Sequence, residues 1–218
     1  MKASFVEVLY GSQARGNTDK LSDVDVLQVG DGDLPAPPLA EPHRLSVSRY
    51  SWEEFQHMRD NGSPFLVHLQ TEGRVVGGNR AGISLYRSLM QYLPRYKHVT
   101  RDTDAFQLAL IDAEDALLHQ DSSPEFEAAA IATVVRHASI LGCYLMDSPQ
   151  FGRYEPTRKF CEARRLPGSI VDDFPHLYEH RIALARGYAW PRDTDYEYVR
   201  TWVRRAGLLV REVANVAA

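Results

Sequence analysis

Two aspartates separated by one residue are the first feature of this chain that could do chemistry. Asp23 and Asp25 begin the segment DVDVLQV, whose β-branched and apolar residues are typical of a strand. Side chains two residues apart on a strand point the same way, so both carboxylates should face a common point while Val24 and Val26 turn into the core. Two adjacent carboxylates repel unless a cation lies between them. Because Mg²⁺ binds one or two protein carboxylates together with substrate phosphates, the pair predicts a site for a magnesium-bound nucleotide.

The residues before the aspartates are suited to contact phosphate. Residues 4–10, SFVEVLY, read as a buried strand that stops at Gly11 and Ser12. Glycine lets the backbone approach a ligand closely, and Ser12 offers a hydroxyl and an N–H to a phosphate oxygen. Arg15 follows three residues later, and its permanently charged guanidinium matches the geometry of a phosphate.

This stretch resembles the DNA polymerase beta-like nucleotidyltransferase superfamily, in particular small bacterial members with a Gly-Ser-x-Ala-Arg-Gly start and a Ser-Asp-x-Asp finish. The motif positions are occupied by Gly11, Ser12, Ala14, Arg15, Gly16, Ser22, Asp23 and Asp25. The resemblance implies that Asp23 and Asp25 hold Mg²⁺, and that Gly11, Ser12, Arg15 and Ser22 bind the nucleotide. The alternative interpretation of the aspartates is an acidic surface hairpin.

A third carboxylate, which active members of the family carry on the next core strand, has no obvious counterpart. The candidate strand is 44–50, RLSVSRY, where inward alternation through Leu45, Val47 and Arg49 leaves Ser46 and Ser48 on the opposite side. A neutral serine cannot replace the charge that a carboxylate gives to a divalent site. Either another acid reaches the site, the candidates being Glu72, Glu41 and Asp31, or the site binds nucleotide with weakened catalysis.

His68 and Glu72 form a second candidate pair. They lie four residues apart in SPFLVHLQTEG, a segment expected to be a helix with proline in its first turn, so they should share one face. One interpretation is an ordinary packed pair on a helix. The other is that Glu72 supplies the missing carboxylate or the catalytic base, with His68 as the second candidate for the base. Further matches to some small bacterial nucleotidyltransferases, including His68-Leu69 and 72–75, extend the resemblance over about the first hundred residues.

The remaining pattern predicts an α+β domain followed by helices. A capping box, Ser51 to Glu54, should open a helix that Asn61 and Gly62 close, and an edge strand at 74–76 should precede a helix at about 82–92. Residues 94–103 contain proline and charge, which places the boundary between a nucleotidyltransferase domain, 1–96, and a helical domain, 97–218. Apolar stripes, the clearest running from Val199 to Val213, predict an all-helical C-terminal bundle. The family's usual first helix is missing, so a C-terminal helix or the second subunit of a homodimer should cover that flank.

Composition narrows the classes of partner. The net charge of -4 argues against tight binding to long nucleic acids, which depends on dense Lys and Arg. Cys143 and Cys161 fit no zinc spacing and are expected to be buried free thiols. With no signal peptide and no run of about 18 apolar residues, we expect a cytoplasmic protein without a membrane partner.

Residues 151–165, FGRYEPTRKFCEARR, are rich in arginine and lysine. They form either a solvated helix face, offset by Glu155 and Glu162, or a site whose arginines bind triphosphate or an acidic acceptor. The sequence leaves both interpretations open.

The function that the resemblance implies is transfer of a nucleoside monophosphate, AMP from ATP or the equivalent from another NTP, to an acceptor hydroxyl. The acceptor is a small molecule or a protein. Two alternatives remain: an antitoxin-like protein that modifies or masks a partner protein, and a degenerate module that binds nucleotide without turnover.

Overall fold

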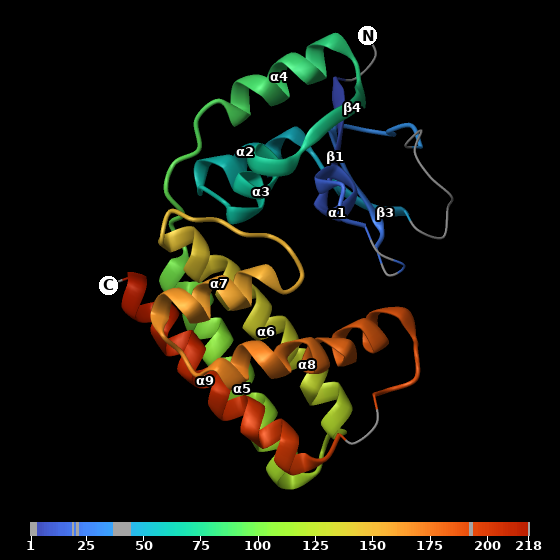
Figure 1. Cartoon of the computed structure of the whole chain (residues 1–218). Helices are drawn as coiled ribbons and strands as arrows, with labels where there is room; N and C mark the ends of the chain where they lie inside the picture. Colours follow the sequence, from blue (N-terminus) through green and yellow to red (C-terminus); the bar gives the residue numbers. More distant parts are fainter. Residues whose placement is uncertain (1–3, 19, 21, 37–44, 192–193, 218) are drawn as a thin grey trace. The chain divides into compact units, whose positions relative to one another are not determined.

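The computed structural model describes residues 4–18, 20, 22–36, 45–191 and 194–217. The chain divides into two compact units, Met1–Lys97 and His98–Ala218. The first contains a sheet with helices, and the described part of the second is helical (Figure 1). The predicted α+β class, with helices alone in the C-terminal part, is confirmed.

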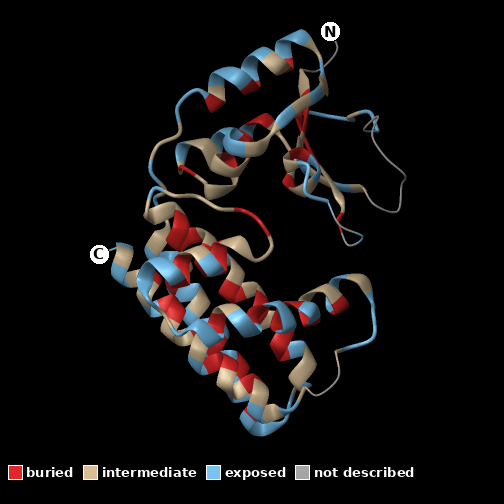
Figure 2. Cartoon of the chain, viewed as in Figure 1, coloured by how far each residue is buried: buried red, intermediate tan, exposed pale blue. Residues whose placement is uncertain are grey.

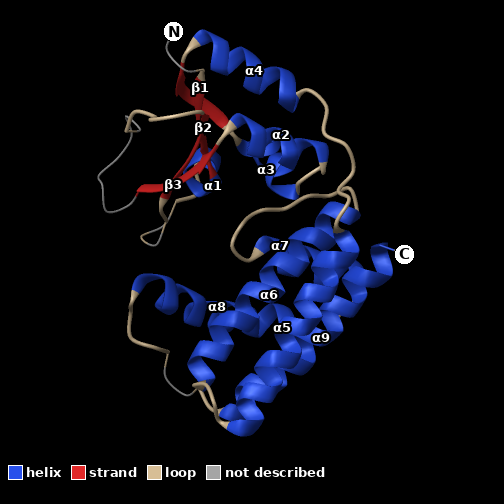
Figure 3. Cartoon of the chain, turned by 180° about the vertical axis from the view of Figure 1, so that it is seen from behind, coloured by secondary structure: helices blue, strands red, loops and turns tan. Residues whose placement is uncertain are grey.

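The first unit is built on a mixed four-stranded sheet (Figure 3). Its elements in chain order are β1 (Phe5–Tyr10), α1 (Gly11–Arg15), β2 (Val24–Gly30), β3 (Leu45–Tyr50), α2 (Trp52–Asp60), α3 (Pro64–Glu72), β4 (Arg74–Gly78) and α4 (Arg80–Met90). The strand order is β3-β2-β1-β4, so β4 is an edge strand as predicted. β1 pairs antiparallel with β2 and β4, whereas β2 and β3 are parallel.

Helices α2, α3 and α4 bury one face of this sheet (Figure 2). Val6 and Val8 of β1, together with Leu27 and Val29 of β2, pack against Phe55, Leu66, Leu69, Tyr86 and Met90 of the helices. Because Leu27 and Val29 alternate with Val26, they share the face of Asp25. Val26 is buried and Val24 half-buried, but both lie on the opposite face, so the prediction that they turn into the core is wrong. Asp25 instead lies on the helix-covered face of the sheet.

The predicted inward alternation of β3 is wrong. Arg49 is exposed, and Tyr50 packs against the core cluster instead. Arg49 donates through Nε to Gln28 Oε1 at 3.0 Å, and Gln28 Nε2 donates to Glu7 Oε1 at 2.8 Å. These three residues are direct cross-strand neighbours, so they form a polar row on the face opposite the hydrophobic core. Hydrogen bonding across the row is what allows Glu7 and Gln28 to be buried.

The second unit consists of α5 (Val99–His119), α6 (Pro124–Leu145), α7 (Glu155–Arg164), α8 (Gly168–Arg186) and α9 (Tyr196–Ala217). α6 packs against each of the other four helices and forms the centre of the unit. The apolar stripe of α9 predicted from the sequence is buried at every position: Val199, Trp202, Val203, Ala206, Leu209, Val210 and Val213. Cys143 and Cys161 are buried free thiols, also as predicted.

α6 modifies the expectation about membrane-spanning segments. By length and composition alone, this helix is apolar enough to cross a membrane, the single such helix among the described residues. Most of its apolar window is buried inside the protein, because α6 is the helix that every other helix of the unit packs against. Its apolar character therefore has a sufficient explanation in the core of the helical unit.

The capping box at the start of α2 yields a stability prediction. Ser51 Oγ accepts from Glu54 N at 3.1 Å, and Ser51 N donates to Glu54 Oε2 at 2.7 Å. We expect Ser51→Ala to lower the free energy of unfolding by about 1 kcal/mol, since it leaves a helix N–H without its acceptor. Ser63 occupies the same position before α3 but makes no side-chain cap bond, so Ser63→Ala is the matched control. Equal losses in urea denaturation of the two variants would contradict the capping explanation.

Candidate active site

The register of the sheet brings three polar side chains to the same end of strands β1, β2 and β3. Asp25, the second residue of β2, pairs with Tyr10 at the end of β1 and with Ser46 near the start of β3. Directly paired residues carry their side chains on the same face, so Asp25 lies between Tyr10 and Ser46. Asp23 immediately precedes β2 and is half-buried, as is Asp25, while Ser22 is buried. Ser46 therefore occupies the position beside Asp25 where the sequence led us to look for a third carboxylate.

Gly11 and Asp25 are in close contact. Gly11 has φ of +73°, and a Cβ atom added to it would lie 2.6 Å from Asp25 Oδ2. The backbone conformation and the close approach both exclude a larger residue. The glycine thus lets an acid lie directly against the backbone where β1 passes into α1, and Ser12, which follows it, is half-buried.

Tyr10 is a member of the site that the sequence analysis did not identify. Its hydroxyl lies 3.2 Å from Ser48 Oγ, and its ring lies 5.5 Å from those of Phe65 and His68, each approached edge-on. Burial is the main cause that raises the pKa of Tyr10; the charge of Asp25 acts in the same direction and the Ser48 hydrogen bond against it. Tyr10 therefore connects the acid of β2 to an aromatic cluster on α3.

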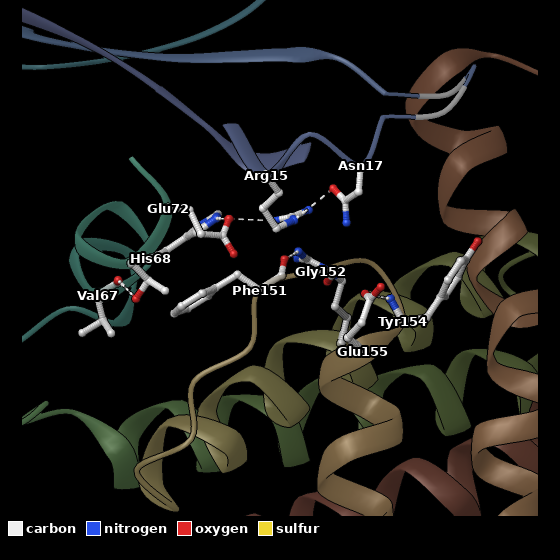
Figure 4. A network of polar contacts seen from close by, with 11 residues as sticks. Arg15, Asn17, Val67, His68, Glu72, Phe151, Gly152, Tyr154 and Glu155 are labelled. Atoms are coloured by element: carbon white, nitrogen blue, oxygen red, sulfur yellow. Dashed lines mark hydrogen bonds and ion pairs between the residues drawn. The ribbon is translucent and has the colours of Figure 1, made fainter. Parts of the chain in front are cut away.

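Glu72 is the centre of a polar network on α1 and α3 (Figure 4). Its Oε2 accepts from Arg15 Nη1 at 2.6 Å and lies 2.8 Å from His68 Nε2. Arg15 Nε also donates to Asn17 Oδ1 at 3.2 Å. The predicted shared face of His68 and Glu72 is confirmed. Arg15, predicted to bind a phosphate, forms an ion pair with Glu72 in this structure.

This network sets the charge of Glu72. Burial alone would raise the pKa of Glu72, but the hydrogen bonds and positive charges of His68 and Arg15 outweigh it and hold the pKa below its usual range. The two contacts of Glu72 differ, because the guanidinium of Arg15 is permanently charged whereas the ring of His68 can be neutral. Glu72 is therefore an ionised acceptor fixed between two donors.

The three candidates for a third carboxylate have different outcomes. Glu72 is bound to Arg15 and His68, as described. Asp31 follows the other end of β2, about 20 Å from Asp25 along the strand, and its Oδ1 accepts from Trp52 N at 3.3 Å. Glu41 lies outside the described residues. In the part of the chain that the structure describes, no three His, Cys, Asp or Glu side chains are grouped so as to hold a metal ion.

Some basic side chains of residues 151–165 form ion pairs with glutamates. Arg158 lies 3.8 Å from Glu162, and Arg164 lies 3.0 Å from Glu212 of α9. The guanidinium carbon of Arg153 lies 5.9 Å from the centre of the Tyr154 ring. For Arg158 and Arg164, these contacts favour the interpretation of a solvated, charge-balanced helix face.

Among known proteins, the chain has only distant structural likenesses. No protein-family model and no curated protein matches this chain. Among solved structures, the chain is similar to a nucleotidyltransferase-like protein from Exiguobacterium sibiricum, with a TM-score of 0.43 and 12% identity, over 96% of this chain and 69% of the other. The likeness is too distant to carry any inference about substrate or chemistry.

The contact between Gly11 and Asp25 predicts unequal costs for two glycine substitutions. Gly16 has φ of +75°, close to that of Gly11, but a Cβ there would meet nothing within 4 Å. We expect Gly16→Ala to cost about 1 kcal/mol from backbone strain alone, and Gly11→Ala to cost about 1–3 kcal/mol more because its Cβ displaces the carboxylate. Adding Asp25→Ala to Gly11→Ala should recover much of that difference in urea denaturation. No coupling between the two substitutions would refute the contact.

The lowered pKa of Glu72 predicts a dependence of stability on pH. A carboxyl whose pKa is lowered by folding stabilises the protein above its unfolded value, here 4.5, and loses that contribution as the pH falls through the folded value. We therefore expect Glu72→Gln to be less stable than the wild type near pH 7, with the difference shrinking as the pH falls below about 4. Glu53, exposed on α2, provides the control Glu53→Gln. A pH-independent difference between wild type and Glu72→Gln would show that the charge of Glu72 contributes nothing.

Proposed function

We propose that this chain is a magnesium-dependent nucleotidyltransferase that moves a nucleoside monophosphate, AMP from ATP, to a hydroxyl of a small-molecule or protein acceptor in the cytoplasm. The observation that carries the proposal is the contact of Asp25 with Gly11, which sets an acid beside a small-residue turn. Such a turn lets a carboxylate lie against the backbone beside Ser12, and the Gly-Ser to Asp-x-Asp sequence supplies the residue types for nucleotide binding.

Asp23 and Asp25, at one end of β2, have the type of side chain that binds a magnesium ion. Asp23 and Asp25 offer hard carboxylate oxygens, and Mg²⁺ needs only one or two of these when substrate phosphates complete its shell. Their half-buried positions leave them accessible to a ligand. When bound, the ion would neutralise charge that develops on the transferred phosphoryl group.

The chain's own residues would position the nucleotide. The backbone N–H and hydroxyl of Ser12 would donate to phosphate oxygens, with Ser22 as a further polar contact, while Gly11 lets Asp25 lie beside them. Arg15 would contribute positive charge close to the phosphates while remaining paired with Glu72. In phosphoryl transfer, such positioning supplies most of the catalysis.

We assign the base to His68 before Glu72, the reverse of the order that the sequence favoured. Glu72 has a lowered pKa and bonds to a permanent cation, which makes it a weak base near neutral pH. A histidine ring held by a carboxylate is a common arrangement for a base, because the carboxylate fixes the orientation of the ring. His68 has this arrangement at 2.8 Å.

A second candidate function is a module that binds nucleotide without turnover. The pairing of Ser46 with Asp25 favours it, because a neutral hydroxyl stands beside the acid where active relatives carry a carboxylate. The antitoxin-like alternative, in which the chain modifies or masks a partner protein, would use the same nucleotide site. Pyrophosphate released with a soluble acceptor supports the small-molecule enzyme, and labelling of a partner protein alone supports the modifier.

Asparagine substitutions test the magnesium-nucleotide site. We expect Asp23→Asn and Asp25→Asn each to weaken magnesium-dependent ATP binding by about tenfold or more while preserving the fold, since removing one of two like charges seldom destabilises. Calorimetric titration with ATP, with Mg²⁺ and with EDTA, measures the effect. Asp33→Asn, on an exposed loop position, is the control and should bind as the wild type does. Undiminished affinity in both site variants would overturn the assignment.

A further inference from the structure

A groove of about 610 Å³ lies between α5 and α9 of the helical unit. We refer to it as the α5–α9 groove. The two helices run in opposite directions (Figure 1), and Arg200 Nη2 of α9 donates to Leu117 O of α5 at 3.5 Å. The residues that line the groove include Ile111 and Glu114 of α5, and Arg204, Gly207 and Arg211 of α9.

The antiparallel arrangement fixes which residues lie at the same level along the groove. Each step back along α5 from Leu117 matches a step forward along α9 from Arg200, because both helices rise by about 1.5 Å per residue. Ile111 is therefore level with Gly207, and Glu114 with Arg204, to within one residue.

The α5 side of the groove exposes large apolar side chains. Ile111 and Leu118 are each 60% exposed, and they share one face of the helix because they are seven residues apart, with Glu114 between them. On the α9 side, Gly207 has no side chain, and a Cβ atom there would meet one atom within 4 Å, Arg211 Nη1 at 3.8 Å. The groove thus has an apolar ridge on one side and open space on the other.

The two sides of the groove carry opposite charges. Glu114 is exposed on α5, and Arg204 and Arg211 are exposed on α9. Arg204 Nη2 lies 3.0 Å from Glu197 Oε1, but both side chains of this pair are more than 60% exposed. Such a surface pair is weak, and the guanidinium has further N–H groups for a second carboxylate.

A second copy of this chain fits both the shape and the charges. A two-fold axis parallel to the helices places α5 of one copy over α9 of the other. That rotation keeps each residue at its level, so Ile111 of one copy lies opposite Gly207 of the other, and Glu114 lies opposite Arg204. Because the interface is symmetric, each of these contacts is made twice.

The face that α5 and α9 form is large enough for a stable dimer. Helices of 21 and 22 residues are about 30 Å long, and two packed side by side are about 20 Å wide. Their projected area of about 600 Å² underestimates the accessible surface, and a standard interface buries about 800 Å² of accessible surface on each partner.

We propose that the α5–α9 groove is the interface of a homodimer. Ile111 of one copy packs into the space beside Gly207 of the other, and Glu114 pairs with Arg204. The apolar ridge and the acid of one copy then meet the open space and the base of its partner. None of the residues proposed to bind nucleotide lies in the groove, so this interface does not depend on the proposed function.

A bulky residue at Gly207 tests the shape of the interface. In sedimentation velocity of the whole protein at micromolar concentrations, we expect the wild type to be a dimer. Gly207→Trp should raise the dissociation constant of that dimer by about tenfold or more, because the indole fills the space that receives Ile111. The far-UV circular dichroism should be unchanged, since the new side chain points into open space and glycine is itself unfavourable in a helix.

Charge reversal tests the pairing and provides its own rescue. Glu114→Arg and Arg204→Glu should each raise the dissociation constant of the homodimer by about tenfold or more, since like charges then meet at two symmetric contacts. In a mixture of the two variants, opposite charges face each other at both contacts, so a heterodimer should form, which native mass spectrometry identifies by its mass. Asp112→Arg is the matched control, because this exposed acid lies two positions from Glu114 and about 160° away around α5.

Three results would overturn the proposal. The first is a wild-type protein that stays monomeric at micromolar concentrations. The second is a dimer that Gly207→Trp and both charge reversals leave as stable as the wild type. The third is a pair of charge-reversed variants that each lose the homodimer yet form no heterodimer when mixed, which would refute the two-fold arrangement.

Discussion

The contact between the Asp25 carboxylate and the backbone of Gly11 is the constraint on which the candidate active site depends. It requires that β1 and β2 pair with Tyr10 opposite Asp25, and that the chain turn at Gly11 with a positive φ. A shift of one residue in that register would carry Asp25 to the other face of the sheet. The core residues Leu27 and Val29, on the same face as Asp25, prevent such a shift because they would leave the helix-packed core.

Charged side chains are arranged differently at the proposed metal site and in the network around Glu72. Arg15 is paired with Glu72 beside His68, whereas Asp23 and Asp25 are the acids that we propose hold a cation. Two neighbouring carboxylates repel unless a cation binds, which is the reason for proposing a metal site at Asp23 and Asp25.

Ser46, which lies beside Asp25, affects how well the proposed site could catalyse transfer. Ser46 cannot supply negative charge, and Glu72, the nearest alternative suggested by the sequence, is committed to Arg15 and His68. Nucleotide binding needs fewer carboxylates than turnover does, because substrate phosphates also provide oxygen ligands. The proposed nucleotide binding therefore requires fewer acidic residues than the proposed transfer does.

The sequence by itself determined the local features. The capping box at Ser51, the strands that flank Gly11 and Asp25, the shared face of His68 and Glu72, and the buried stripe of α9 all follow from spacing and residue type. Each depends on residues within a few positions of one another, for which helix and strand periods suffice.

Only the tertiary structure decided the faces and the partners. Val26 and Leu27 are adjacent and both buried, so alternation along β2 could not tell which face the helices cover. Arg15 meets Glu72 from 57 positions away, and Tyr10 meets Ser48 across a strand. These outcomes depend on which segments fold against one another, and neither a period nor a motif in one stretch of sequence specifies that.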